Sequence, residues 1–250
     1  MHIILENIPS AESRAVRLAG MLNDNIRVTN SSFEGLQEHR DSLNAGAIPV
    51  GSVQFLRQAM KLAGATEPTN SSYPSGCEPY TRRNILRSTA ERALSMTGAR
   101  FIKSEQTKVV TGFVLDSDSG SLGLNDHDRV QFNRLCALPA SAPVWVSEVV
   151  EWVSEFRYYV MDSQILGRGR YDQDDLDLVP EPDTETVQRC IVDVAIPHPY
   201  ALDMGVLSSG QTALVEVNDA WAIGLYAGDM KPYVYVEFLA NRWKSIWRAA

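Results

Sequence analysis

The sequence from Ala201 to Asp219 reads ALDMGVLSSGQTALVEVND, and its pattern predicts a β-hairpin. Apolar residues dominate two arms, Ala201–Leu207 and Thr212–Val217, and the SSGQ segment between them is typical of a turn. Because side chains alternate between the two faces of a strand, Glu216 and Asn218 lie on one face of the second arm. The hairpin is therefore expected to present two oxygen-bearing side chains together.

A third oxygen-bearing side chain, Asp203, stands on the first arm of this hairpin. Cross-strand pairing could bring its carboxylate beside Glu216. Carboxylate and amide oxygens suit Mg²⁺, which binds a few protein oxygens together with water and substrate phosphate. Asp203, Glu216 and Asn218 are therefore candidate magnesium ligands. The alternative is an exposed hairpin with a polar face, and the spacing alone favours neither interpretation.

The N-terminal part of the chain alternates strands with helices. The apolar segment Ile3–Leu5 predicts a first strand, a helix is expected to start near Ser10, and Ile26–Val28 predicts a second strand. Ser52 can accept a hydrogen bond at the start of another helix, which Gly64 can end in a left-handed conformation. This order of elements indicates an α/β fold.

A boundary between two domains is expected near residue 76. The segment Thr66–Pro79 holds the densest set of helix-breaking residues in the chain, among them Pro68, Pro74 and Gly76. A chain of 250 residues suits one large domain or two modest ones, at roughly 100–200 residues each. We therefore expect an N-terminal α/β domain at 1–76 and a second domain at 77–250.

The second domain is expected to combine several strands with three helices. Apolar residues at helical spacing predict one helix from Ile85 to Gly98, another after the capping residue Asp183, and a last one carrying Leu239–Trp247. The strands outside the hairpin are expected at Arg100–Lys103, Val109–Leu115, Val144–Val153, Arg157–Met161 and Gln164–Gly167.

Composition argues against several functional classes. With 23 basic and 31 acidic side chains, the net charge of −8 disfavours nonspecific nucleic-acid binding as the function, because such binding needs clustered Lys and Arg. No apolar run reaches the roughly 20 residues of a membrane span, and the N-terminus does not resemble a signal peptide. Cys77, Cys136 and Cys190 lie far apart and form no CxxC pair. We therefore expect a cytoplasmic protein without a membrane partner, a zinc ribbon or a disulfide framework.

Several pieces of the chain resemble the ATP-grasp ligases. Asp203 followed by Glu216-x-Asn218 is similar to the magnesium motif of these enzymes. Phe101-Ile102-Lys103 resembles their nucleotide-binding strand, and Val144–Val150 resembles their adenine-side hinge strand. The run Glu155-Phe156-Arg157 is similar to the acid-x-arginine strand of their glutamate-ligase-like members.

More narrowly, the chain from about Ile48 to the C-terminus resembles the ATP-grasp clade named for one arginine and two lysines, which is known largely from phage and bacterial genomes. The matching pieces are Ile48–Val53, Tyr73-Pro74, Lys103, Lys108 with Thr111-Gly112, Glu216–Asp219, Gly224-x-Tyr226 and Arg242-Trp243. The resemblance implies an ATP-grasp fold, α/β with α+β subdomains, preceded by a small α/β domain. It also implies a nucleotide-binding subdomain at about 77–146 and a magnesium-binding, catalytic subdomain at about 147–250.

The resemblance further implies roles for the charged side chains. Lys103 would present a positive charge to an ATP phosphate from a strand end, and Lys108 would bring a second one from the following loop. Arg157 would hold a carboxylate or phosphoryl oxygens with its planar guanidinium, and Glu155 would orient it. Arg170, on the returning strand, is another candidate for this pocket. Taken singly, each could instead be an ordinary surface charge.

Glu148 would receive a ribose hydroxyl or the adenine amino group, and the backbone of Val149 and Val150 would contact the base. The chain departs from the wider family at 104–112, SEQTKVVTG, which holds one glycine where many members have a glycine-rich loop. A short turn carrying Lys108 is expected there instead. The arginine of the clade corresponds to Arg82 or Arg83.

The function implied is that of an ATP-dependent ligase that forms a carbon–nitrogen bond. A carboxylate would attack the γ-phosphate of ATP, and an amine would then displace phosphate from the acyl phosphate. ATP and Mg²⁺ are the implied cofactors, and the unknown carboxylate and amine would belong to an amino acid, a peptide or a protein terminus. Two alternatives stay open: a phosphotransferase acting on a hydroxyl, and a nonenzymatic nucleotide-binding module.

Overall fold

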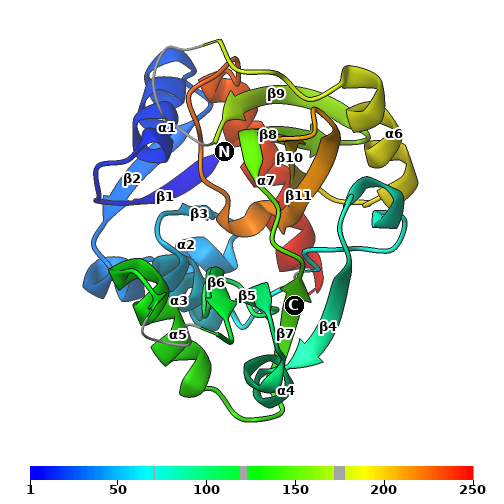
Figure 1. The fold of residues 1–250 in the computed structure, drawn as a ribbon. Helices are drawn as coiled ribbons and strands as arrows, with labels where there is room; N and C mark the ends of the chain where they lie inside the picture. Colours follow the sequence, from blue (N-terminus) through cyan, green and yellow to red (C-terminus); the bar gives the residue numbers. More distant parts are fainter. Residues whose placement is uncertain (70, 119–122, 172–177, 250) are drawn as a thin grey trace.

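The computed structural model describes residues 1–69, 71–118, 123–171 and 178–249. The described residues form three β-sheets, one of three strands and two of four. The first sheet lies at the left of Figure 1, the second at the bottom and the third at the upper right. Among these residues, no helix combines the length and the apolar composition that crossing a membrane requires.

The first sheet is parallel, with the order β2-β1-β3. Its elements are β1 (His2–Glu6), α1 (Ala11–Leu22), β2 (Arg27–Ser31), a 3₁₀ helix (Glu34–His39), α2 (Arg40–Asn44), β3 (Ile48–Val50) and α3 (Val53–Ala63). The side chains of Ser10 and Ser52 cap α1 and α3, and Gly64 ends α3 with φ = +71°. The strands and helices expected in this part of the chain are thus confirmed.

The second sheet is antiparallel, with the order β4-β7-β5-β6. Its elements are β4 (Ile85–Thr89), α4 (Ala90–Ser95), β5 (Ala99–Ser104), β6 (Phe113–Asp116), α5 (Asp126–Cys136) and β7 (Pro143–Ser147). Ile102, Phe113 and Val144 are buried in the core of this unit, between the sheet and its helices.

Three sequence predictions in this unit are wrong. Residues 85–89 form β4 rather than the start of a helix, because they pair with Pro143–Ser147. The strand expected at Val109–Leu115 begins only at Phe113, because the preceding residues form a turn. The strand expected at Val144–Val153 is divided between two sheets, since Ser147 ends β7 and Trp152 begins β8.

The third sheet is antiparallel, with the order β11-β10-β8-β9. Its elements are β8 (Trp152–Met161), β9 (Gln164–Arg170), α6 (Thr184–Val194), β10 (Tyr200–Leu207), β11 (Thr212–Asp219), a 3₁₀ turn (Ala220–Ala222) and α7 (Pro232–Ala249); another 3₁₀ turn, Glu78–Tyr80, precedes the second sheet. The hairpin of β10 and β11 and the helix capped by Asp183 are confirmed. The C-terminal helix is also confirmed.

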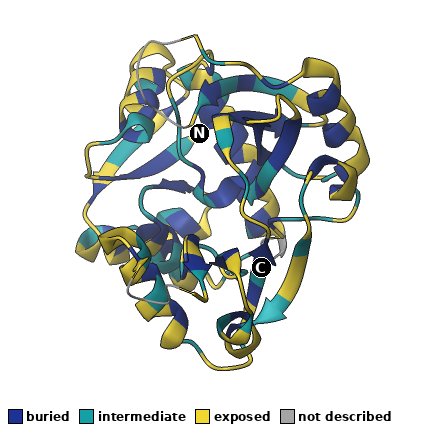
Figure 2. Cartoon of the chain, viewed as in Figure 1, coloured by how far each residue is buried: buried dark blue, intermediate teal, exposed yellow. Residues whose placement is uncertain are grey.

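Each face of the third sheet is covered by a helix. Val187 and Ile191 of α6 pack with Tyr158 and Leu202 on one face, whereas Phe238 of α7 belongs to the core that covers the other. That second core also contains buried residues of the first sheet and its helices, and Figure 2 shows these elements with buried segments in dark blue. The N-terminal α/β unit is therefore packed directly on α7, and the division at residue 76 stays a prediction.

Candidate active site

The three candidate metal ligands lie together on the β10–β11 hairpin. Asp203 is paired in register with Glu216, and Ala201 is paired with Asn218 two residues along the hairpin. The Asn218 Nδ2 atom donates to Asp203 Oδ2 at 2.9 Å and to Glu216 Oε1 at 2.8 Å. Asp203 is buried, with 2% of its surface exposed. The expected pairing of Asp203 with Glu216 is therefore confirmed.

The carboxylates of Asp203 and Glu216 are each paired with a cation from another strand. Arg157 on β8 donates from Nε and Nη2 to the two oxygens of Asp203, at 2.7 Å and 2.6 Å. β8 neighbours β10, and Arg157 stands directly opposite Asp203 in the register. Lys103, near the end of β5, donates its ammonium to Glu216 Oε2. The site therefore joins the second sheet to the third.

Burial and pairing act against each other in this network. Burial disfavours the charged forms of Lys103 and Arg157, but the adjacent carboxylates outweigh it and raise the pKa of each. Burial likewise opposes ionisation of Glu216, but the Lys103 charge and the hydrogen bonds from Lys103 and Asn218 together outweigh it and lower the pKa. For Asp203, burial raises the pKa despite the opposing effect of Arg157.

The donor set of this hairpin fits a hard cation such as Mg²⁺. The side chains of Asp203, Glu216 and Asn218 meet on adjacent strands, with the Asn218 amide nitrogen turned to both carboxylates, and each side chain carries an oxygen of the kind that Mg²⁺ prefers. In the described part of the chain, no cluster of three or more His, Cys, Asp or Glu side chains is arranged to hold a metal. A metal here would therefore use few protein ligands and take the rest from water and substrate.

A turn after β5 brings Lys108 to the same place. Ser104 Oγ donates to the carbonyl of Gln106 at 2.7 Å and accepts from the Val110 amide at 2.9 Å, which closes the turn. Lys108 lies within it at φ = +56°, and Gly112 leaves it at φ = +112°. A Cβ atom on Gly112 would lie 2.4 Å from the Phe101 ring, so glycine is required there. The expected lysine-bearing turn is thus present.

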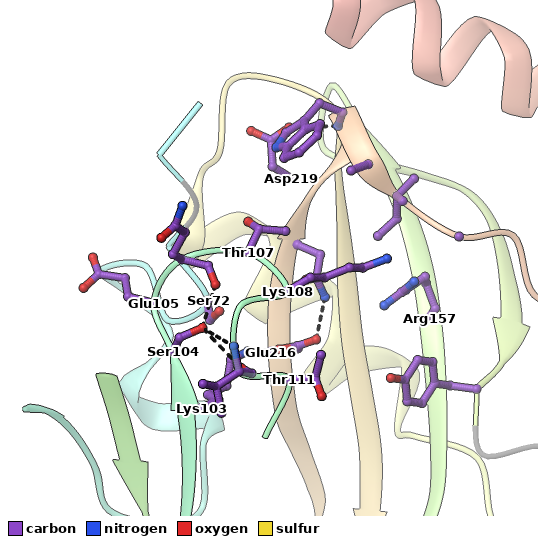
Figure 3. Close-up of a pocket in the computed structure, with 18 of the residues that line it drawn as sticks. Ser72, Lys103, Ser104, Glu105, Thr107, Lys108, Thr111, Arg157, Glu216 and Asp219 are labelled. Carbon is purple, nitrogen blue, oxygen red and sulfur yellow. Dashed lines mark hydrogen bonds and ion pairs between the residues drawn. The ribbon is translucent and has the colours of Figure 1, made fainter. Parts of the chain in front are cut away.

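The first cavity, of about 180 Å³, lies between this turn and the hairpin. Lys108, Arg157 and Glu216 surround it in Figure 3. Burial lowers the pKa of Lys108, and the nearby charge of Arg157 lowers it further. Lys103, Lys108 and Arg157 thus line one small space together with the carboxylates of Glu105, Glu216 and Asp219, so an anionic ligand such as a phosphate group would meet three cationic side chains there.

Two tyrosines hold the Arg157 guanidinium from its sides. Its Cζ atom lies 5.2 Å from the ring centre of Tyr171 and 4.9 Å from that of Tyr226. The two rings pack edge to face at 4.8 Å. The sequence pattern predicted no role for Tyr171, and Tyr226 was named only as part of the resemblance. The two tyrosines come from the end of β9 and from the loop before α7, so their contact with Arg157 depends on the tertiary structure.

The second cavity, of about 310 Å³, opens between the second and third sheets. Glu148, Val150 and Glu155 line it, as do Phe101 and Trp152. Glu148 accepts hydrogen bonds from the backbone and side-chain amides of Asn84, at 3.0 Å and 2.7 Å, which lower its pKa. Aromatic walls with a few polar groups at the rim are suited to a heterocyclic base.

Arg83, rather than Arg82, enters this second cavity. Its guanidinium donates to the carbonyls of Leu214 and Val215 on β11, at 2.7 Å and 3.0 Å. It also lies 5.3 Å from the Trp152 ring, whereas Arg82 is exposed. The position of Arg83 depends on its contacts with β11, far along the chain. The sequence alone therefore could not distinguish Arg83 from the adjacent Arg82.

Most of the candidate residues surround these two adjoining cavities. Lys103, Thr111, Tyr171 and Glu216 line both of them. Lys108, Arg157 and Asn218 line the first, and Glu148, Val150, Glu155 and Asp203 line the second. Arg170 belongs to the described lining of neither cavity. It pairs with Phe156 on β8, whose side chain points to the opposite face from Arg157.

Comparisons with known proteins identify the family and the fold of this chain. Residues 80–236, more than half of the chain, match a family model of the ATP-grasp domain, family 2 of the clade named for one arginine and two lysines. No curated protein matches the sequence.

Solved structures with the same fold include D-alanyl-alanine synthetase A from Vibrio cholerae, which is 13% identical with a TM-score of 0.53, over 100% of this chain and 99% of that one. D-Alanine–D-alanine ligase from Bacillus anthracis in complex with ATP is 10% identical with a TM-score of 0.53, over 99% and 98% of the two chains. N5-Carboxyaminoimidazole synthetase from Staphylococcus aureus is 6% identical with a TM-score of 0.52, over 96% and 77%. At these identities the likeness concerns the fold.

Proposed function

The chain belongs to family 2 of this arginine-and-two-lysines clade of ATP-grasp domains, and on this premise we propose that it is an ATP-dependent carboxylate–amine ligase. The observation that carries the proposal is the convergence of Lys103, Lys108 and Arg157 on one cavity beside paired acidic groups. Such a site can neutralise the charge of a triphosphate next to oxygen ligands for a divalent cation.

The two cavities would divide the nucleotide between them. The larger one would take the base and ribose, with Phe101 and Trp152 as apolar walls and Glu148 and Val150 at its rim. The smaller one would take the phosphates, because three cationic side chains line it. Lys103 and Glu216 line both cavities and would therefore lie near the phosphate chain.

Asp203, Glu216 and Asn218 would hold Mg²⁺, and the ion would neutralise charge on the β- and γ-phosphates when bound. Lys103 would leave Glu216 and donate to a phosphate oxygen, which would free the Glu216 carboxylate for the ion. Arg157 and Lys108 would place the substrate carboxylate against the γ-phosphorus. The protein then acts chiefly by positioning reactants and balancing charge, as phosphoryl transfer requires.

The proposed reaction needs no nucleophile from the protein. A carboxylate oxygen attacks the γ-phosphorus, the bond to the β-phosphate oxygen breaks, and ADP leaves. The amine nitrogen then attacks the acyl carbon, the carbon–oxygen bond to phosphate breaks, and the nitrogen loses a proton. The products are an amide, ADP and phosphate.

Mg-ATP binding and turnover test this proposal in one set of variants. We expect Mg-ATP to raise the melting temperature of the wild-type protein, since a ligand that binds the native state stabilises it. Lys103→Met should remove most of this shift and reduce ADP release by about 100-fold or more, equivalent to roughly 3 kcal/mol of lost phosphate stabilisation. Lys61→Met, in α3, is the control for losing a lysine outside these cavities.

The chemical class of the product separates the proposed ligase from the alternatives. Condensation of two substrates gives a product whose mass equals their sum minus water, and it releases ADP and phosphate. A product that gains a phosphoryl group on a hydroxyl would instead identify a phosphotransferase. Absence of a melting shift with Mg-ATP at millimolar concentration would reject both activities.

A further inference from the structure

The turn that carries Lys108 is held from two sides, and one of them is the N-terminal α/β unit. Within the second unit, the Gln131 side chain of α5 accepts a hydrogen bond from the Thr111 amide at 3.1 Å. From the other side, Arg57 of α3 donates from Nη2 to the Thr107 carbonyl at 3.0 Å. This second contact holds the residue directly before Lys108 and joins it to a different part of the fold.

Glu67 determines the direction of the Arg57 guanidinium. Its two carboxylate oxygens accept hydrogen bonds from Nε and Nη2 of Arg57, at 2.7 Å and 2.8 Å. A guanidinium held at two atoms has a fixed plane, and Nη2 is thereby directed at the Thr107 carbonyl as well. The two side chains are 31% and 28% exposed, and an ion pair this accessible contributes little to overall stability.

The helix that carries Arg57 is a firm support. Ser52 caps the start of α3, and Gly64 ends it. Phe55 and Leu56 of the same helix are buried in the core that also contains the first sheet. Arg57 therefore extends from an element whose position is fixed by packing, and it reaches across to a turn of the second unit.

Lys108 requires such a support for two reasons. Its φ of +56° lies in the left-handed region, which a residue with a Cβ atom adopts at a cost and keeps only where surrounding contacts hold it. Its ammonium is also acted on by charges of both signs, namely the cations Arg157 and Arg57 and the carboxylates Glu12 and Glu216. These carboxylates can draw the ammonium away from a phosphate group, so the position of the backbone determines which group it meets.

Lys108 lies where the end of a bound nucleotide is expected. Lys103 lines both the first and the second cavity, whereas Lys108 belongs to the described lining of the first and not of the second. With the base in the second cavity, Lys103 would face the nearer phosphates and Lys108 the terminal one. Arg57 belongs to the described lining of neither cavity, and Glu67 balances its charge.

We propose that Arg57 is a positioning residue of the phosphate site: through the Thr107 carbonyl, it fixes the turn so that Lys108 meets the terminal phosphate of ATP. The inference rests on the proposed function, which places the phosphates in the first cavity. Arg57 acts through the turn and not by contact with the nucleotide. The N-terminal unit thereby takes part in phosphate binding, and Glu67 contributes by orienting the arginine.

The difference between Mg-ATP and Mg-ADP isolates this effect, because the two nucleotides differ in the terminal phosphate. Titration calorimetry measures both dissociation constants without a carboxylate or amine substrate. For Arg57→Met we expect the Kd of Mg-ATP to rise by about 5-fold or more, and that of Mg-ADP to change by less than about 2-fold. Retained Mg-ADP binding also shows that the variant is folded. Lys61→Met removes an exposed cation from the same helix; as the matched control, it should change neither constant.

A double variant tests whether Arg57 acts through Lys108. Lys108→Met alone should weaken Mg-ATP binding at least as much as Arg57→Met does, since it removes the charge itself. Adding Arg57→Met to Lys108→Met should then have no further effect, whereas an independent or general structural role would give additive losses.

Arg57→Lys separates position from charge. Lysine keeps the positive charge but lacks the planar fork that joins Glu67 and the Thr107 carbonyl at fixed angles. The Mg-ATP affinity of Arg57→Lys should therefore resemble that of Arg57→Met.

Three results would overturn the inference while leaving the proposed function intact: an Mg-ATP affinity of Arg57→Met that falls no more than its Mg-ADP affinity, additive losses in the double variant, or wild-type affinity in Arg57→Lys. If the wild-type protein does not bind Mg-ATP in the titration, the proposed function fails, and the inference that depends on it fails as well.

Discussion

The buried ion pair between Arg157 and Asp203 makes the stability of the protein sensitive to a single charge. Arg157 is 5% exposed and Asp203 is 2% exposed, and two hydrogen bonds of 2.7 Å and 2.6 Å join them. Asp203→Asn keeps the shape of the side chain but removes its charge. The guanidinium then stays buried without a counter-ion, and it cannot deprotonate to escape the cost.

The expected cost can be estimated in two ways. Removing one partner of a buried ion pair typically costs about 3–5 kcal/mol. Independently, hydrogen bonds between charged groups contribute roughly 1.5–3 kcal/mol each, and asparagine weakens both of those that Arg157 makes. We therefore expect Asp203→Asn to reduce the free energy of unfolding by about 3–5 kcal/mol, a large part of the roughly 5–15 kcal/mol typical of a domain.

Urea unfolding of the ligand-free protein measures this cost. Glu181→Gln is a suitable control, since it breaks a pair with Arg168 whose side chains are 37% and 54% exposed, and such a pair contributes at most about 1 kcal/mol. The double variant Arg157→Met/Asp203→Asn should be less destabilised than the sum of the two single variants, because it leaves no unpaired charge. Equal costs for Asp203→Asn and Glu181→Gln would refute the reasoning.

Two further predictions concern the nucleotide cavity and the fold. Arg83→Ala should reduce the melting shift caused by Mg-ATP, because it removes the hydrogen bonds to β11 at the cavity wall. Arg82→Ala, the control, should leave the shift unchanged within error. Equal shifts for the two variants would reject the assignment of Arg83 to the nucleotide cavity. A thiol reagent at about pH 8 should label Cys136 of the native protein quickly, since it is exposed. Burial raises the pKa of Cys77 to about 11 and that of Cys190 to about 12, so both should react only on unfolding, as mass spectrometry of labelled peptides can test.

The elements predicted correctly are those whose signals are local. Ser10, Ser52 and Asp183 each cap the helix expected after them, because capping depends on a few neighbouring residues. The β10–β11 hairpin was predictable for the same reason, since alternation and a short turn between the arms determine which side chains share a face. Asp203 beside Glu216 follows from that register.

The wrong predictions concern segments whose structure depends on distant partners. Ile85 and Leu86 are apolar at a spacing that a helix would tolerate, but they pair with Ser147 and Val146, which lie far along the chain. The run Val144–Val153 looks continuous, but its first part pairs within the second sheet and its last residues belong to the third. Backbone pairing of this kind overrides local preference.

Local patterns in the chain identify the acidic hairpin, the lysine of β5 and the family to which both point. Their partners come from elsewhere in the fold: Arg157 meets Asp203 because β8 lies beside β10, and Lys103 meets Glu216 where two sheets face each other. The second cavity exists only because the second and third sheets face each other. Such charges and cavities depend on long-range packing, since a sequence records the order of residues along the chain and not which of them exclude water together.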